Sequence, residues 1–105
     1  MKETLQVFIQ HLKEERFSEA HEVMEHQWKA YKKCDHPLTK LLKGYINGAT
    51  AFELLRRDKR EGAERLWTVY EKYLPALQEG IEEYTLFTEA DSLLQALKRE
   101  RLSSV

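Results

Sequence analysis

The segment Phe17–Trp28 holds two histidines, three glutamates and a tryptophan, a density of acid–base and metal-binding side chains that no other part of the chain matches. Because one residue advances an α-helix by about 100°, His21 and Glu25 lie one turn apart, on or beside the apolar stripe of this helix. Such a pair can share a divalent metal ion or move a proton, with Trp28 walling a pocket. The competing interpretation is structural, with a half-buried imidazole hydrogen-bonded to a carboxylate.

The same rotation places Glu22 and His26 on the outward side of the helix, where water screens a charged pair. No metalloprotease motif is complete: His-Glu-x-x-His would need histidine at position 25, and the inverted form would need histidine at position 22. Two ligands seldom hold a metal ion, so a site at His21 and Glu25 needs further ligands. The candidates are His11, Glu14, Glu15, Asp35 and His36.

A basic cluster lies further along the chain, formed by Arg56, Arg57, Lys59, Arg60 and Arg65. Phosphate or RNA could bind such a cluster. Three carboxylates are interleaved with it and no aromatic residue interrupts its turn, which disfavours nucleic acid as a partner. Cys34 stands among basic residues that would lower a thiol pKa, but no oriented base accompanies it. No glycine-rich phosphate loop or Ser-His-Asp order is present, which disfavours an enzyme of a familiar motif class.

The elements that position these residues are predicted to be helices. The chain has 105 residues, 42% of them hydrophobic and 33% charged, which suits a single domain with a real core and argues against disorder. Glycine and proline are scarce, and apolar residues recur at intervals of three and four. The sequence therefore predicts an all-α fold, a compact bundle of about five helices forming one domain over residues 1–105.

Capping and breaking residues predict the helix boundaries. The first helix is expected over residues 2–14, and Ser18 is the predicted N-cap of the second. Pro37 suits the first turn of a third helix that runs to about Arg57. Pro75 should kink or break the fourth helix near Leu74. A capping box from Thr88 to Asp91 is expected to begin the last helix, and residues 99–105 are expected to fray.

Charge and composition also limit the location and the partners. The formal net charge is −1, no uninterrupted apolar stretch resembles a secretory signal, and no window is long enough to span a membrane. With a single cysteine, these features predict a cytoplasmic protein with no membrane partner. Leu54 is expected to point away from the apolar face of the third helix, and Trp67 to lie at the margin of the apolar seam of the fourth, where exposure could mark a homo-oligomer or partner surface.

The segment Phe17–Glu25, with Trp28, resembles the F-x-E-A-H-E-V-L-E-x-x-W signature of the domain of unknown function 309 family. Lys43–Ile46 is similar to the second block of that family, and Arg56–Ala63 to its third. The resemblance spans roughly residues 17–77. It implies a small all-α bundle from bacteria or archaea and brings no known activity.

What the resemblance adds is a reason to single out four residues as signature positions: His21, Glu22, Glu25 and Trp28. The resemblance changes the interpretation of Glu22 most, since periodicity alone places this residue at the surface. Some positions depart from the family pattern. Met24 replaces the usual leucine, Asn47 stands where glutamine is common, and Asp58 stands where glycine is common.

Two hypotheses follow. In the first, the chain is a non-enzymatic structural or interaction module whose His21, Glu22 and Glu25 organise the bundle. His21→Ala should then lower the free energy of unfolding by about 1–3 kcal/mol. In the second, the chain binds a divalent metal or a small ligand through these residues beside Trp28, as a hydrolase would. The identity of a small-molecule ligand is not predicted.

Overall fold

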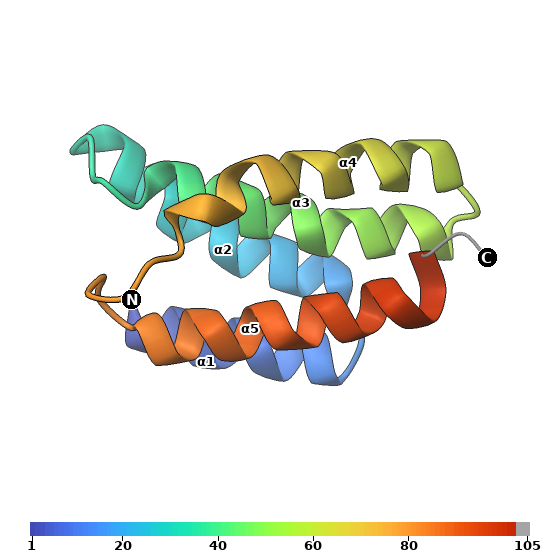
Figure 1. Ribbon diagram of the computed structural model, residues 1–105, viewed down its shortest axis with the longest axis horizontal. Helices are drawn as coiled ribbons and strands as arrows, with labels where there is room; N and C mark the ends of the chain where they lie inside the picture. The colour runs from blue at the N-terminus through green and yellow to red at the C-terminus, as the bar shows by residue number, and fades with distance from the viewer. Residues whose placement is uncertain (103–105) are drawn as a thin grey trace.

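The computed structural model describes residues 1–102, in which five α-helices and two short helical segments form the fold and no strand occurs (Figure 1). The prediction of an all-α bundle of about five helices is therefore confirmed. The elements are α1 (Lys2–Lys13), α2 (Phe17–Lys33), α3 (Thr39–Arg56), α4 (Arg60–Tyr73), the 3₁₀ helix η1 (Leu74–Ala76), α5 (Tyr84–Leu97) and the π-helix η2 (Lys98–Leu102).

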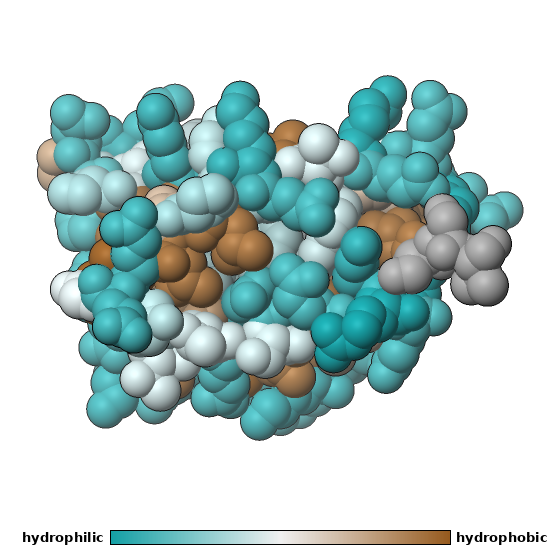
Figure 2. Space-filling model, in the orientation of Figure 1, coloured by the Kyte–Doolittle hydropathy of each residue, from teal (hydrophilic) through white to brown (hydrophobic). Residues whose placement is uncertain are grey.

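Helices that follow one another in the chain pack together from α1 to α4, and α5 then returns to lie beside α1 (Figure 1). α3 lies between α2 and α4, whereas it meets α5 only slightly. Figure 2 shows the molecule from the same side as Figure 1. The surface seen there is mostly hydrophilic, with apolar side chains visible along the seam between η1 and α5. None of the helices in residues 1–102 combines the length and apolarity that crossing a membrane requires.

Two of the predicted helix starts are wrong by one or two residues. α2 begins at Phe17, and Ser18 lies inside its first turn without a side-chain capping bond. Phe17 is 1% exposed and contacts the ring of Phe52. Its packing in the core therefore favours a helix that begins one residue before Ser18. Pro37 precedes α3, which begins at Thr39.

Pro75 ends the fourth helix. α4 stops at Tyr73, Pro75 lies in η1, and Leu77 and Ile81 belong to the non-helical link that leads to α5. The predicted capping box is wrong, because α5 already begins at Tyr84 and Thr88 lies within it. This earlier start brings Phe87, which is fully buried, against the ring of Tyr45.

Each link between consecutive α-helices contains a non-glycine residue in the left-handed region. These residues are Glu15 (φ 58°), Asp35 (φ 54°), Asp58 (φ 61°) and Glu83 (φ 55°). This conformation costs an L-residue roughly 1–2 kcal/mol, and glycine adopts it freely. Asp58 therefore holds a backbone conformation that glycine adopts more readily.

The core is rich in aromatic rings, and two tyrosine hydroxyls form hydrogen bonds within it. The Tyr45 hydroxyl donates to the backbone oxygen of Phe87 at 2.7 Å, and the Tyr70 hydroxyl donates to the Asp91 carboxylate at 2.5 Å. Burial first, and then the neighbouring Tyr45 and Asp91, raise the pKa of Tyr70, so its hydroxyl remains a donor. These bonds connect α3 and α4 to α5. Trp67 is 3% exposed, so it lies in this core and not at the margin of the apolar seam as predicted.

Candidate functional site

His21 and Glu25 form the pair that helical spacing predicts. The Nε2 atom of His21 lies 2.9 Å from Oε2 of Glu25, and Nζ of Lys29 lies 3.4 Å from the other carboxylate oxygen. The side chains of His21 and Glu25 are about one third exposed. Partial burial acts to raise the pKa of Glu25, but His21 and Lys29 outweigh it and hold that pKa below its usual value. Both polar groups therefore have local partners.

Glu22 and His26 are exposed on the opposite side of α2, as the periodicity predicts. Neither makes an ion pair or a hydrogen bond within residues 1–102. The structure therefore does not bring Glu22 to the His21–Glu25 pair. Of the four candidate residues, it groups only His21 and Glu25 through a direct bond.

The proposed additional metal ligands do not join the pair either. Glu15 binds Arg101, with N–O distances of 2.9 and 2.5 Å, and His36 lies 3.4 Å from Glu82. Across the described part of the chain, no three His, Cys, Asp or Glu side chains converge in a way that could hold a metal ion. The described residues thus offer His21 and Glu25 no third ligand.

Trp28 occupies a different environment, in which two lysines cover its ring. The Nζ atom of Lys43 lies 4.5 Å from the ring centre, and that of Lys32 lies 4.9 Å away. Lys32 comes from α2 itself, one turn after Trp28, and Lys43 comes from α3. The indole is half-buried against the core, so its position is fixed while the ammonium groups remain near solvent.

The lysines around Trp28 were missed by sequence reasoning. Lys32 could have been found, because residues four apart on a helix are neighbours. Lys43 could not, because helical periodicity does not show which residues of two helices meet.

A family model described as Domain of unknown function (DUF309) matches residues 5–66, more than half of the chain. The chain belongs to the DUF309 family. No curated protein and no solved structure matches it. The matched residues run from α1 into the first half of α4, so they include both the His21–Glu25 pair and Trp28 with its two lysines.

Several residues in the segments that resemble the family have roles in the fold. Ala20 and Met24 are fully buried. A methyl group added at Gly44 would lie 3.1 Å from Cβ of Tyr73, so this glycine lets α3 and α4 approach closely. Trp28 and Lys43, which belong to the first and second blocks, meet between α2 and α3. These contacts account for much of the resemblance without any chemistry.

The charge around Trp28 is mostly positive. Between positions 25 and 43 the chain has five lysines and two acidic residues, Glu25 and Asp35, and Glu25 is paired with His21 and Lys29. Lys33 and Lys40 are exposed. Glu82 approaches from the link before α5, but its carboxylate accepts a 2.7 Å hydrogen bond from Tyr31 and lies beside His36. We call Trp28 together with Lys32 and Lys43 the Trp28 surface.

The basic cluster predicted at Arg56–Arg65 is divided by the structure. Arg56 and Arg57 both lie within 4 Å of the Glu53 carboxylate. Arg60 binds Glu64 at 3.1 Å and donates to the backbone oxygen of Leu102 at 2.9 Å. Most of this positive charge therefore serves internal bonds, which weakens the case for an extended nucleic-acid surface.

Proposed function

We propose that this chain is a cytoplasmic, non-enzymatic interaction module that binds an acidic segment of a partner protein on the Trp28 surface. The observation that carries the proposal is the placement of Lys32 and Lys43, from two helices, over one half-buried indole. The single cysteine supports the cytoplasmic location.

The Trp28 ring preorganises positive charge for such a partner. A lysine on the surface samples many rotamers, and fixing it for a contact costs conformational entropy. Stacking against the indole restricts Lys32 and Lys43 before a partner arrives, and each ammonium group still has capacity for a carboxylate. Tryptophan is also a frequent centre of binding energy in protein interfaces. A glutamate- or aspartate-rich segment with one apolar residue would match both features.

The contacts of His21 and Glu25, together with those of the two lysines over Trp28, favour binding over catalysis. His21 and Glu25 bind one another, and Glu25 also binds Lys29, so both polar groups already have partners. Lysines over an indole supply positive charge without an oriented base or nucleophile. These features support an interaction module and offer no reaction.

Fluorescence anisotropy of a labelled polyglutamate peptide tests this proposal. We expect saturable binding that weakens with added salt, since charge pairs at a surface are screened. Lys32→Gln with Lys43→Gln should reduce the affinity by about tenfold, the equivalent of about 1.4 kcal/mol. The matched control is Lys33→Gln with Lys40→Gln, which removes the same number of charges from the same two helices but leaves both indole contacts.

Equal losses in the two double variants would contradict the proposal, because general charge would then explain binding. A single-stranded oligonucleotide of equal charge that binds more tightly than the peptide would overturn it in favour of nucleic acid. Sedimentation of the protein alone would reveal a homo-oligomer. A dimer that disappears in Lys32→Gln with Lys43→Gln would instead assign this surface to self-association.

A further inference from the structure

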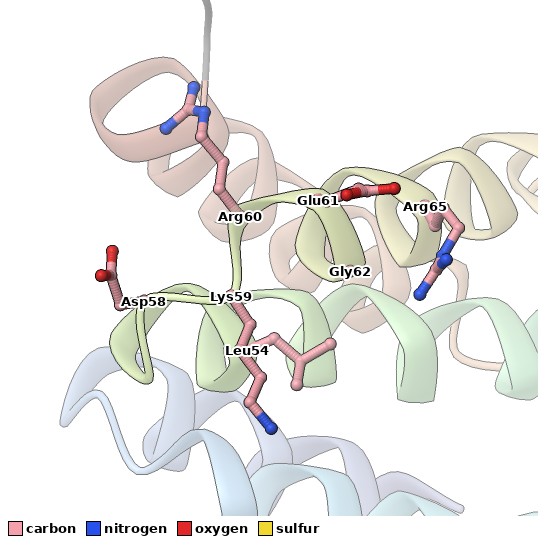
Figure 3. Close-up of a pocket in the computed structure, with 7 residues that line it drawn as sticks. All are labelled: Leu54, Asp58, Lys59, Arg60, Glu61, Gly62 and Arg65. Atoms are coloured by element: carbon pink, nitrogen blue, oxygen red, sulfur yellow. The ribbon is translucent and has the colours of Figure 1, made fainter.

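A pocket of about 430 Å³ lies at the corner where α3 passes into α4 (Figure 3). Leu54 from the end of α3 and Gly62 from the first turn of α4 form its apolar part. Lys59, which links the two helices, and Arg65 in α4 also line it. It is at the opposite end of α3 from Lys43, so it is separate from the Trp28 surface.

The two cations lie on either side of Leu54. Figure 3 shows the side chains of Lys59 and Arg65 flanking Leu54, while Asp58 and Arg60 extend away in other directions. Neither acidic residue of the lining forms an ion pair with Lys59 or Arg65 within residues 1–102.

Lys59 and Arg65 have no internal partner. Within residues 1–102, neither forms a hydrogen bond, an ion pair or a ring contact, in contrast to Arg56, Arg57 and Arg60 around the same corner. Two like charges that share a pocket repel one another, and an anion between them removes that repulsion. Lys59 and Arg65, whose charges are not used in ion pairs within residues 1–102, therefore both line this pocket.

Gly62 keeps the pocket open. A Cβ atom at position 62 would lie 3.2 Å from Cδ1 of Leu54 and 3.9 Å from a guanidinium nitrogen of Arg65. Any larger side chain there would enter the space between the two. The first N–H groups of α4, which have no partner inside a helix, begin at the same corner.

We infer that this pocket binds a phosphomonoester of a small polar metabolite. A guanidinium group can donate two parallel hydrogen bonds to a phosphate, and a lysine ammonium supplies a compact second charge. The volume accommodates a sugar phosphate. No aromatic side chain lines the pocket to stack a base, which disfavours nucleotides.

The test is a titration of the full chain with glucose 6-phosphate, inorganic phosphate and acetate, followed by ¹⁵N–¹H NMR. We expect saturable shifts at Lys59, Gly62 and the Arg65 side chain with both phosphates and weaker shifts with acetate. Arg65→Gln should reduce the affinity at least about tenfold, and Arg65→Lys should fall between it and wild type because it retains charge without the guanidinium fork.

Arg57→Gln is the matched control, because it removes one charge from the same corner outside the pocket lining. It should leave the affinity nearly unchanged. Linear shifts that never saturate, or equal losses in Arg57→Gln and Arg65→Gln, would mean a general ion atmosphere and would overturn the inference. Tighter binding of inorganic phosphate than of the sugar phosphate would overturn the assignment to a phosphomonoester.

Discussion

At the scale of single residues, polar groups of α2 that could do chemistry are bound to neighbours or left in solvent. The His21 imidazole has Glu25, and Glu25 also has Lys29. Glu22 and His26 are exposed. The most distinctive residue of the helix is Trp28, because it holds charges from two helices in place.

Replacing His21 with alanine should lower the free energy of unfolding by only about 0.5 kcal/mol, less than the 1–3 kcal/mol expected for a buried pair. After the replacement, the one-third-exposed Glu25 still has water and Lys29. Urea unfolding of His21→Ala, Glu25→Ala and the double variant would measure the coupling. His26→Ala is the exposed control and should change little. A loss above about 2 kcal/mol in His21→Ala would show that the imidazole supports more than this pair.

At the scale of elements, close packing between α3 and α4 depends on glycine. The added methyl group in Gly44→Ala would lie 3.1 Å from Cβ of Tyr73, an atom fixed to the backbone of α4. The helix itself would have to shift, and overpacking of this kind costs about 1–3 kcal/mol. The higher helix propensity of alanine returns about 1 kcal/mol. We therefore expect a net loss of stability of about 1 kcal/mol, measured by thermal or urea unfolding.

Gly62→Ala is the comparison for this prediction. Its methyl group would meet the end of the partly exposed Leu54 side chain at 3.2 Å, and that side chain can rotate away. Stability should therefore stay constant or rise by up to about 1 kcal/mol. If Gly44→Ala were as stable as Gly62→Ala, close contact between α3 and α4 would not be what requires glycine at position 44.

At the scale of the whole molecule, Arg101 connects the end of the chain to the α1–α2 link. It donates to both carboxylate oxygens of Glu15, and this hydrogen bonding is the main reason that the pKa of Glu15 is below its usual value of about 4.5. A lowered folded-state pKa contributes stability above the unfolded-state pKa, and that stability is lost as the pH falls through the folded-state value.

Arg101→Gln should therefore reduce stability most above about pH 4.5, and its difference from wild type should shrink as the pH falls below that value. Urea unfolding of both proteins across this range is the measurement, with Arg99→Gln as a nearby exposed control. A difference that does not change with pH would mean that Arg101 acts through packing and not through the Glu15 carboxylate.

Local features of the sequence were enough to predict the five helices and the adjacency of His21 and Glu25, because both depend on positions within one helix. The burial of Trp67 and the early start of α5 were missed, because they arise from contacts between helices. The Trp28–Lys43 contact and the pocket that Lys59 and Arg65 line were missed for the same reason. The polar groups of the site were visible in sequence, but their partners were not.

The return of α5 to α1 has a consequence for synthesis on the ribosome. α2, α3 and α4 can each pack on the preceding helix as they emerge, since those contacts join neighbours in the chain. The side of α1 that receives α5 stays uncovered until α5 has been translated. Apolar surface exposed for that time is a target for chaperones and for aggregation. The packing of α1 is therefore completed only after the four other α-helices of the bundle have been made.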